Sequence, residues 1–137
     1  MDEQAGAPRG QWHEDLARID GQHQVLQAGT KQFLALLEES RPQAEATRAL
    51  AELVALLELH FHTEELLMGR AGFPEQHAHS LLHQACLQQV RGVLGELELG
   101  TRRPLAELRE LIQVWIHDHM DRQDQRFEAF LKHKRPT

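Results

Sequence analysis

Four helix-prone segments, separated by proline and glycine, constrain the fold of this chain most strongly. Breaks occur at SRPQ (40–43), GRAGFP (69–74) and LGTRRP (99–104), and a further RP stands at 135–136. The segments between these breaks are rich in Leu, Ala, Glu and Gln, which favour helix, and none shows the alternating pattern of a strand. The sequence therefore predicts an all-α protein.

Each segment carries an apolar stripe at steps of three and four residues, the spacing of one helix face. Histidine interrupts every stripe. The stripes run through Leu16, Ile19, His23, Leu26, Thr30, Phe33 and Leu37; Leu50, Leu53, Leu57, His60, Glu64 and Leu67; His79, Leu82, His83, Cys86, Val90, Val93 and Leu97; and Leu105, Leu108, Ile112, Trp115 and His119, then Arg122 or Gln123. Because short connections favour antiparallel neighbours, we expect an up-down-up-down antiparallel four-helix bundle over residues 12–134, after a short N-terminal arm (1–11).

Composition and charge argue against several classes of protein. The 137 residues carry a net charge of −6, and their basic residues are scattered, so the sequence predicts no binding to nucleic acid. The longest apolar runs are a few residues, and the acidic N-terminus lacks the apolar core of a signal peptide, so we expect no membrane segment. The single cysteine, Cys86, rules out an internal disulfide and fits the cytoplasm.

Histidines and carboxylates at helical spacing indicate a buried metal site. His60 and Glu64 are four residues apart, as are His79 and His83, so each pair lies on one helix face about one turn apart. Antiparallel packing brings the histidines of all four stripes to the same end of the bundle. Nitrogen and carboxylate ligands together suit Fe, Zn, Mn or Cu, whereas an all-oxygen set would suit Mg or Ca.

The last segment offers two alternative pairs of ligands. His117 and Asp121 have the four-residue spacing of a helical pair, whereas His119 and Asp124 are five apart. The stripe through Trp115 favours His119, but periodicity alone leaves both pairs open.

The remaining histidines and the cysteine have simpler interpretations. His62 and His77 fall off their stripes, and His13 and His133 stand at the ends of elements, so we expect these four on solvated surfaces. Cys86 continues the third stripe, where we expect it to act as a small buried hydrophobe.

Four stretches of the chain resemble the hemerythrin family, specifically its single-domain bacterial members. They are IDGQH (19–23), HFHTEELLM (60–68), GFPEQHAHSLLH (72–83) and WIHDHMDRQD (115–124). They occur in the family's order and spacing, and the resemblance extends over nearly the whole chain.

The resemblance implies a non-haem di-iron centre with five histidines, two bridging carboxylates and an oxo or hydroxo bridge. The family pattern selects His119 and Asp124 over His117 and Asp121. The implied ligands are His23, His60, Glu64, His79, His83, His119 and Asp124. His79, His83 and His119 would hold one iron, and His23 and His60 the other, which keeps an open position. The implied O₂ pocket comprises Phe61, Trp115, Ile116 and Met120.

The implied function is reversible binding of O₂ for carriage, storage or delivery, by a protein that is not an enzyme. Oxygen-activating di-iron bundles use mostly glutamates, whereas five neutral imidazoles make electron transfer to O₂ easier to reverse. The alternatives are an oxygen or redox sensor that acts through a separate protein, and an oxidase or peroxidase at the same centre. O₂ is the one partner that the sequence indicates. Asp20 and Glu65 are candidates for fixing the imidazole orientations.

Overall fold

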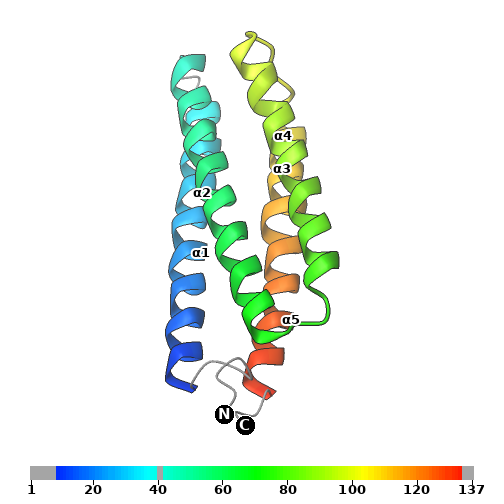
Figure 1. Cartoon of the computed structure of the whole chain (residues 1–137). Coiled ribbons are helices and arrows are strands. Elements are labelled where there is room, and N and C mark those ends of the chain that lie inside the picture. Colours follow the sequence, from blue (N-terminus) through cyan, green and yellow to red (C-terminus); the bar gives the residue numbers. More distant parts are fainter. Residues whose placement is uncertain (1–8, 40–41, 134–137) are drawn as a thin grey trace.

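The computed structural model describes residues 9–39 and 42–133, and side chains within 14–39, 42–118 and 121–133. Three long helices, α1 (Arg9–Glu38), α2 (Gln43–Ala71) and α3 (Gln76–Glu98), precede a fourth rod. That rod consists of α4 (Leu105–Leu111), the π-helical segment η2 (Ile112–Asp118) and α5 (His119–His133). The four rods lie side by side and alternate in direction (Figure 1). The predicted all-α, up-down-up-down four-helix bundle is confirmed.

Proline and glycine set the helix boundaries as the breaks predicted. Pro42 and Pro104 stand directly before α2 and α4, where a missing N–H removes no helical hydrogen bond. Gly72 and Gly100 follow α2 and α3 with φ of 71° and 84°, the left-handed conformation that glycine adopts most easily. Helix α1 begins at Arg9, within the predicted arm, and the boundary at residue 12 stays a prediction.

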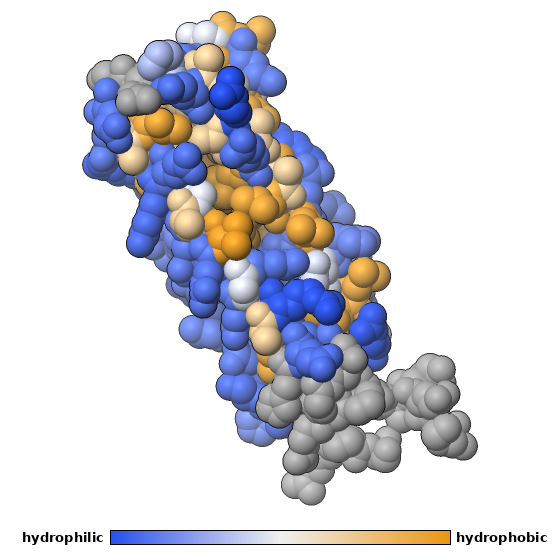
Figure 2. Space-filling view, turned by 90° about the vertical axis from the view of Figure 1, so that its left-hand side faces the viewer, coloured by the Kyte–Doolittle hydropathy of each residue, from blue (hydrophilic) through white to orange (hydrophobic). Residues whose placement is uncertain are grey.

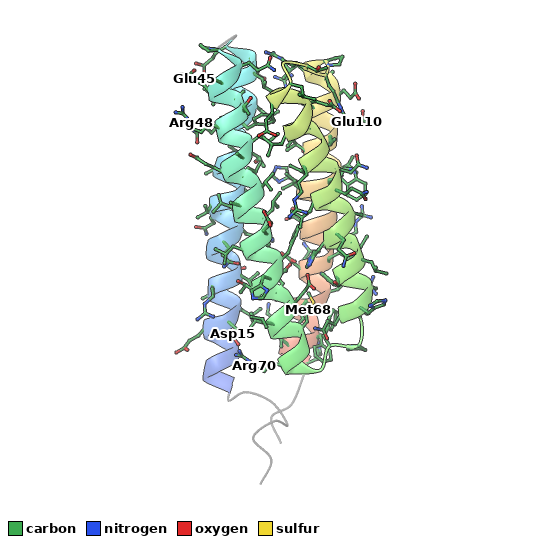
Figure 3. All side chains as sticks on the ribbon, turned by 45° about the horizontal axis from the view of Figure 1, so that its top comes forward. Asp15, Glu45, Arg48, Met68, Arg70 and Glu110 are labelled. Atoms are coloured by element: carbon green, nitrogen blue, oxygen red, sulfur yellow. The ribbon has the colours of Figure 1, made fainter. Side chains whose placement is uncertain are left out.

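Two apolar clusters fill the bundle, one on each side of a buried polar layer. The large cluster lies toward the end where α2 begins, and includes Phe33, Leu50, Leu53, Leu57, Val90, Val93, Leu97, Leu108 and Ile112. The small cluster lies toward the end where α2 finishes, and comprises Ile19, Leu67, Met68, Ala71, Phe73, Phe127 and Leu131. Figure 3 shows Met68 near that end and Glu45, Arg48 and Glu110 at the other.

The face of the molecule drawn in Figure 2 is mainly hydrophilic. Figure 2 shows polar and charged residues over most of one face, with apolar side chains gathered near its middle. None of the described helices is long and apolar enough to cross a membrane.

The fourth rod departs from its predicted stripe. Trp115 is half-buried, Arg122 is exposed and Gln123 is half-buried, whereas the buried side chains within the described 121–133 are Asp124, Phe127 and Leu131. The physical reason is the π-helical segment, whose wider turns rotate all later residues relative to a regular α-helix. The prediction that the stripe continues through Arg122 or Gln123 was therefore wrong.

Candidate metal centre

Six of the seven predicted ligands have described side chains, and these six meet in the polar layer between the two apolar clusters. They form two groups, and within each group one potential ligand atom per residue lies within 4.8 Å of the others. The first group is His23, His60 and Asp124, and the second is Glu64, His79 and His83. The seventh, His119, is the first residue of α5, and its side chain lies outside the described part of the structure.

The carboxylate of Glu64 links the two groups, and that of Asp124 joins the two histidines of the first. Glu64 Oε1 is 3.1 Å from His83 Nε2 in its own group and 3.6 Å from His60 Nε2 in the other. Asp124 Oδ2 contacts His23 Nε2 and lies 3.6 Å from His60 Nε2. A carboxylate within reach of imidazoles from both groups is the arrangement that two neighbouring cations would share.

The layer is largely buried, yet many of its polar atoms lack hydrogen-bond partners. Exposure is 0% for His60 and Glu64 and 1% for His79. Eight buried atoms make no hydrogen bond within the described structure: His23 Nε2, His60 Nε2, both carboxylate oxygens of Glu64 and of Asp124, and both ring nitrogens of His79. Each such atom costs about 1–3 kcal/mol when nothing binds it, and native proteins have few of them. All eight belong to predicted ligands, so the residues fit a bound cation.

The two histidines of helix α3 have lowered pKa values, which favours the neutral form that binds metal. Burial, with a smaller contribution from the nearby His83, lowers the pKa of His79 to about 4. Burial also lowers the pKa of His83, although Glu65 opposes it. Both rings are therefore neutral at pH 7, which is the form that ligates metal.

Burial and neighbouring charges shift the pKa values of the two carboxylates in opposite directions and raise that of His23. Burial raises the pKa of Glu64, and the charge of Asp124 raises it further. Burial would raise the pKa of Asp124 as well, but contacts with Glu64, His23 and His60 outweigh burial and lower it. Burial would lower the pKa of His23, but Asp124, and then Asp121 and Asp20, outweigh it and raise the value.

Two side chains outside the layer orient the imidazoles. His83 donates from Nδ1 to Glu65 Oε2 over 2.9 Å, and His60 Nδ1 lies 2.9 Å from the amide oxygen of Gln22. Gln22 also donates to Thr63 Oγ1 over 3.2 Å, which fixes its amide with the oxygen toward His60. In each ring Nδ1 carries the hydrogen and Nε2 faces the centre.

The sequence anticipated only one of these orienting residues. Glu65 was a candidate for this role, and the structure places it there. Asp20, the other candidate, instead lies at the rim of a cleft. Gln22 was not predicted for this role, although it lies beside His23 in the IDGQH stretch (19–23).

The predicted O₂ pocket residues occupy different positions. Phe61 is buried and stacks on His83, with ring centroids 4.0 Å apart and planes at 6°. Ile116 is buried and lines a small cavity beside His23. Trp115 is half-buried against the large cluster, and the side chain of Met120 lies outside the described residues. Phe61 and Ile116 thus provide apolar walls near the proposed ligands.

The rival His117 lies beside the two groups and belongs to neither. It is half-buried, and its Nε2 is 3.4 Å from Thr30 Oγ1. The Thr30 hydroxyl donates to the Gln27 carbonyl over 2.8 Å, so His117 is the donor to Thr30.

The other histidines and the cysteine lie where simple interpretations put them. His62, His77 and His133 are exposed, and the side chain of His13 lies outside the described residues. Cys86 is buried, 3% exposed, and burial raises its thiol pKa to about 12.

Comparison with known proteins agrees with this geometry. The hemerythrin HHE cation binding domain matches residues 14–131. A bacteriohemerythrin of Ralstonia nicotianae is 32% identical over 133 residues, covering 92% of this chain and 91% of the relative. A bacteriohemerythrin of Stenotrophomonas maltophilia is 28% identical over 125 residues, covering 88% and 80%, and one of Pseudomonas paraeruginosa is 26% identical over 129, covering 89% and 81%. No solved structure matches the chain significantly. The chain therefore belongs to the hemerythrin family of cation-binding helical domains.

Proposed function

We propose that this chain binds O₂ reversibly at a non-haem di-iron centre, for carriage, storage or local delivery in the cytoplasm. The observation that carries the proposal is the pair of adjacent buried ligand groups, with the Glu64 carboxylate in reach of imidazoles from both. The proposed ligands are His23, His60, Glu64, His79, His83, His119 and Asp124.

The ligand set favours two irons over one structural zinc. Imidazole nitrogens and carboxylate oxygens are ligands that iron accepts readily. A structural zinc ion takes four ligands in a closed tetrahedron, whereas this layer offers six described candidates in two groups. Two separate positions, each with three candidates, also leave room for an open coordination position.

The protein's own side chains would fix the centre and keep it dry. When bound, two irons would supply the electrons that O₂ takes up on binding and returns on release. Glu65 and Gln22 hold the rings of His83 and His60 with Nε2 inward. Phe61, stacked on His83, covers one side with apolar surface and so excludes water from that side.

The proposed ligand set, and the side chains that contact it from outside, favour O₂ binding over catalysis. Di-iron enzymes built on four-helix bundles use a Glu from each of two helices and Glu-x-x-His pairs from the others. Five histidines with two carboxylates is a more neutral set. The polar side chains that touch the ligands from outside, Gln22 and Glu65, are each engaged by a ring nitrogen, so neither is placed as a free acid or base. O₂ is the one partner we propose.

Anaerobic reconstitution with Fe²⁺ tests this function. The visible spectrum is recorded as O₂ is admitted and then removed by repeated flushing with argon. We expect an O₂-dependent absorption that reverses over several cycles. Irreversible oxidation on the first exposure would overturn reversible binding and favour sensing or turnover.

A further inference from the structure

A cleft between α1 and α5 leads from the surface to the proposed metal centre. It has a volume of about 180 Å³, which is room for several water molecules. Its floor includes His23, Glu64 and Asp124, and its rim includes Asp20 and Asp121. The cleft therefore connects solvent with both carboxylates of the centre.

The lining of this cleft is acidic. Half of its ten lining residues carry carboxylates, and none is Lys or Arg. Glu128 is paired with Lys132 over 2.8 Å, but Asp20 and Asp121 are exposed and make no ion pair with a described residue. A cleft lined by charge of one sign concentrates ions of the opposite sign and speeds their association.

A second observation shows that the cleft ends at a site for a cation. Glu64 lines the cleft, is 0% exposed, and neither of its carboxylate oxygens makes a hydrogen bond within the described structure. Asp124 lines the same cleft at 8% exposure, contacts His23, and has no hydrogen bond at either carboxylate oxygen within the described structure. Uncharged O₂ gains nothing from these carboxylates, whereas a divalent cation does.

We infer that the α1/α5 cleft is the route by which hydrated divalent metal ions reach the centre, and that Asp20 and Asp121 draw them to its mouth. This inference rests on the proposed metal centre. It assigns to Asp20 and Asp121 a role in the rate of metal uptake, and none in the final number of ions bound. An anion is repelled by the same rim.

Metal uptake kinetics test the inference. Metal-free protein is mixed anaerobically with Fe²⁺, and a colorimetric chelator traps unbound Fe²⁺ at set times. We expect Asp20→Asn/Asp121→Asn to take up Fe²⁺ about three- to tenfold more slowly at low ionic strength, with the difference vanishing in high salt. The final iron content should equal that of the wild-type protein.

Three further variants make the result specific. Asp20→Glu/Asp121→Glu keeps the charge and should keep the wild-type rate. Gln125→Lys places a cation in the cleft lining and should slow uptake. Glu98→Gln/Glu110→Gln makes the same change in net charge at exposed positions of the remote end and should leave the rate unchanged (Figure 3).

The outcomes separate the inference from the proposed function. A wild-type protein that binds fewer than two ions overturns the proposed centre, and the inference falls with it. Normal iron content with equal rates for the cleft and remote pairs overturns the inference alone. Faster uptake in the cleft pair would also overturn it, because the two aspartates would then hinder the entry of cations.

Discussion

The two ends of this bundle are stabilised in different ways. At the end where α2 begins, the large cluster joins all four rods through apolar side chains such as Leu53, Val90 and Leu108, each 1% exposed. At the other end the small cluster is separated from it by a buried layer of histidines and carboxylates with unpaired atoms. Apolar burial stabilises the first end by itself, whereas the second needs something to neutralise its polar layer. Because the ligands are buried there, the stability of the second end depends on bound metal.

Removing the metal should change stability the most, and it should do so mainly at the end that contains the polar layer. Ions that bind only the folded state stabilise it by about 4 kcal/mol when the free metal is a thousand times the Kd. Urea unfolding of loaded and metal-free protein measures the loss. Hydrogen exchange should show amides near His23, Glu64 and Asp124 losing protection, while those near Leu53 and Val90 keep it. Equal loss along the whole bundle would contradict the comparison.

Leu53→Ala should weaken the other end. Removing this buried side chain leaves a cavity and should reduce the free energy of unfolding by about 3 kcal/mol. The reduction should be the same with and without metal, because Leu53 belongs to the large cluster alone. Iron content measured by elemental analysis should not change. A loss of iron from this variant would mean that the two ends are not independent.

The effect of His79→Leu on stability should change sign between the metal-free and the metal-loaded protein. The variant removes two unpaired ring nitrogens, so the metal-free protein should gain about 1–2 kcal/mol while metal binding is lost. Folded His79, with its pKa lowered to about 4, stays neutral where the unfolded ring takes up a proton. The free energy of unfolding of the wild-type protein should therefore fall as pH falls from about 6.5 toward 4. The leucine variant should not show this decrease. Thermal melts across that range measure both effects.

The matched control for this variant is His77→Leu. His77 is exposed on the same helix, so its replacement should alter neither the iron content nor the pH dependence. A metal-free His79→Leu protein less stable than the wild type at pH 7 would show that the ring nitrogens are satisfied.

Glu65→Gln should weaken metal binding moderately. The carboxylate accepts from His83 Nδ1, and loss of such an orienting partner typically weakens metal affinity at least tenfold. Competition with a chelator of known affinity measures the Kd, and Glu52→Gln, exposed on the same helix, is the control. An unchanged Kd would show that packing against Phe61 alone orients this ring.

His117→Ala and its exposed control His62→Ala should have the smallest effects of the series. His117→Ala removes one hydrogen bond to Thr30 and should cost about 1 kcal/mol, with iron content retained. His62→Ala, at an exposed position, should stay within about 0.5 kcal/mol. Iron loss in the His117 variant would reopen His117 and Asp121 as the ligand pair.

Regular helix made the first three rods predictable. Where α2 and α3 keep ordinary α geometry, the positions four residues apart, His60 with Glu64 and His79 with His83, lie one above the other as their spacing predicted. Burial at these positions follows from the stripe, because its apolar members Leu57, Leu67, Cys86 and Val90 are buried too.

The register of the fourth rod beyond η2 and the contact of Gln22 with His60 could not be predicted from the sequence. No residue type in Ile112–Asp118 specifies a π-helical turn, so the later stripe was predicted one face away from where Asp124 and Phe127 lie. Gln22 was missed because its role depends on the distance between α1 and α2, which sets its 2.9 Å contact with His60. Tertiary spacing of this kind has no local signature.

Anomalous diffraction at the iron absorption edge, from crystals of the Fe²⁺-loaded protein, tests the central claim most directly. We predict two iron peaks, one beside His23, His60 and Asp124 and the other beside Glu64, His79 and His83. A single peak, or iron bound outside this layer, would contradict the account.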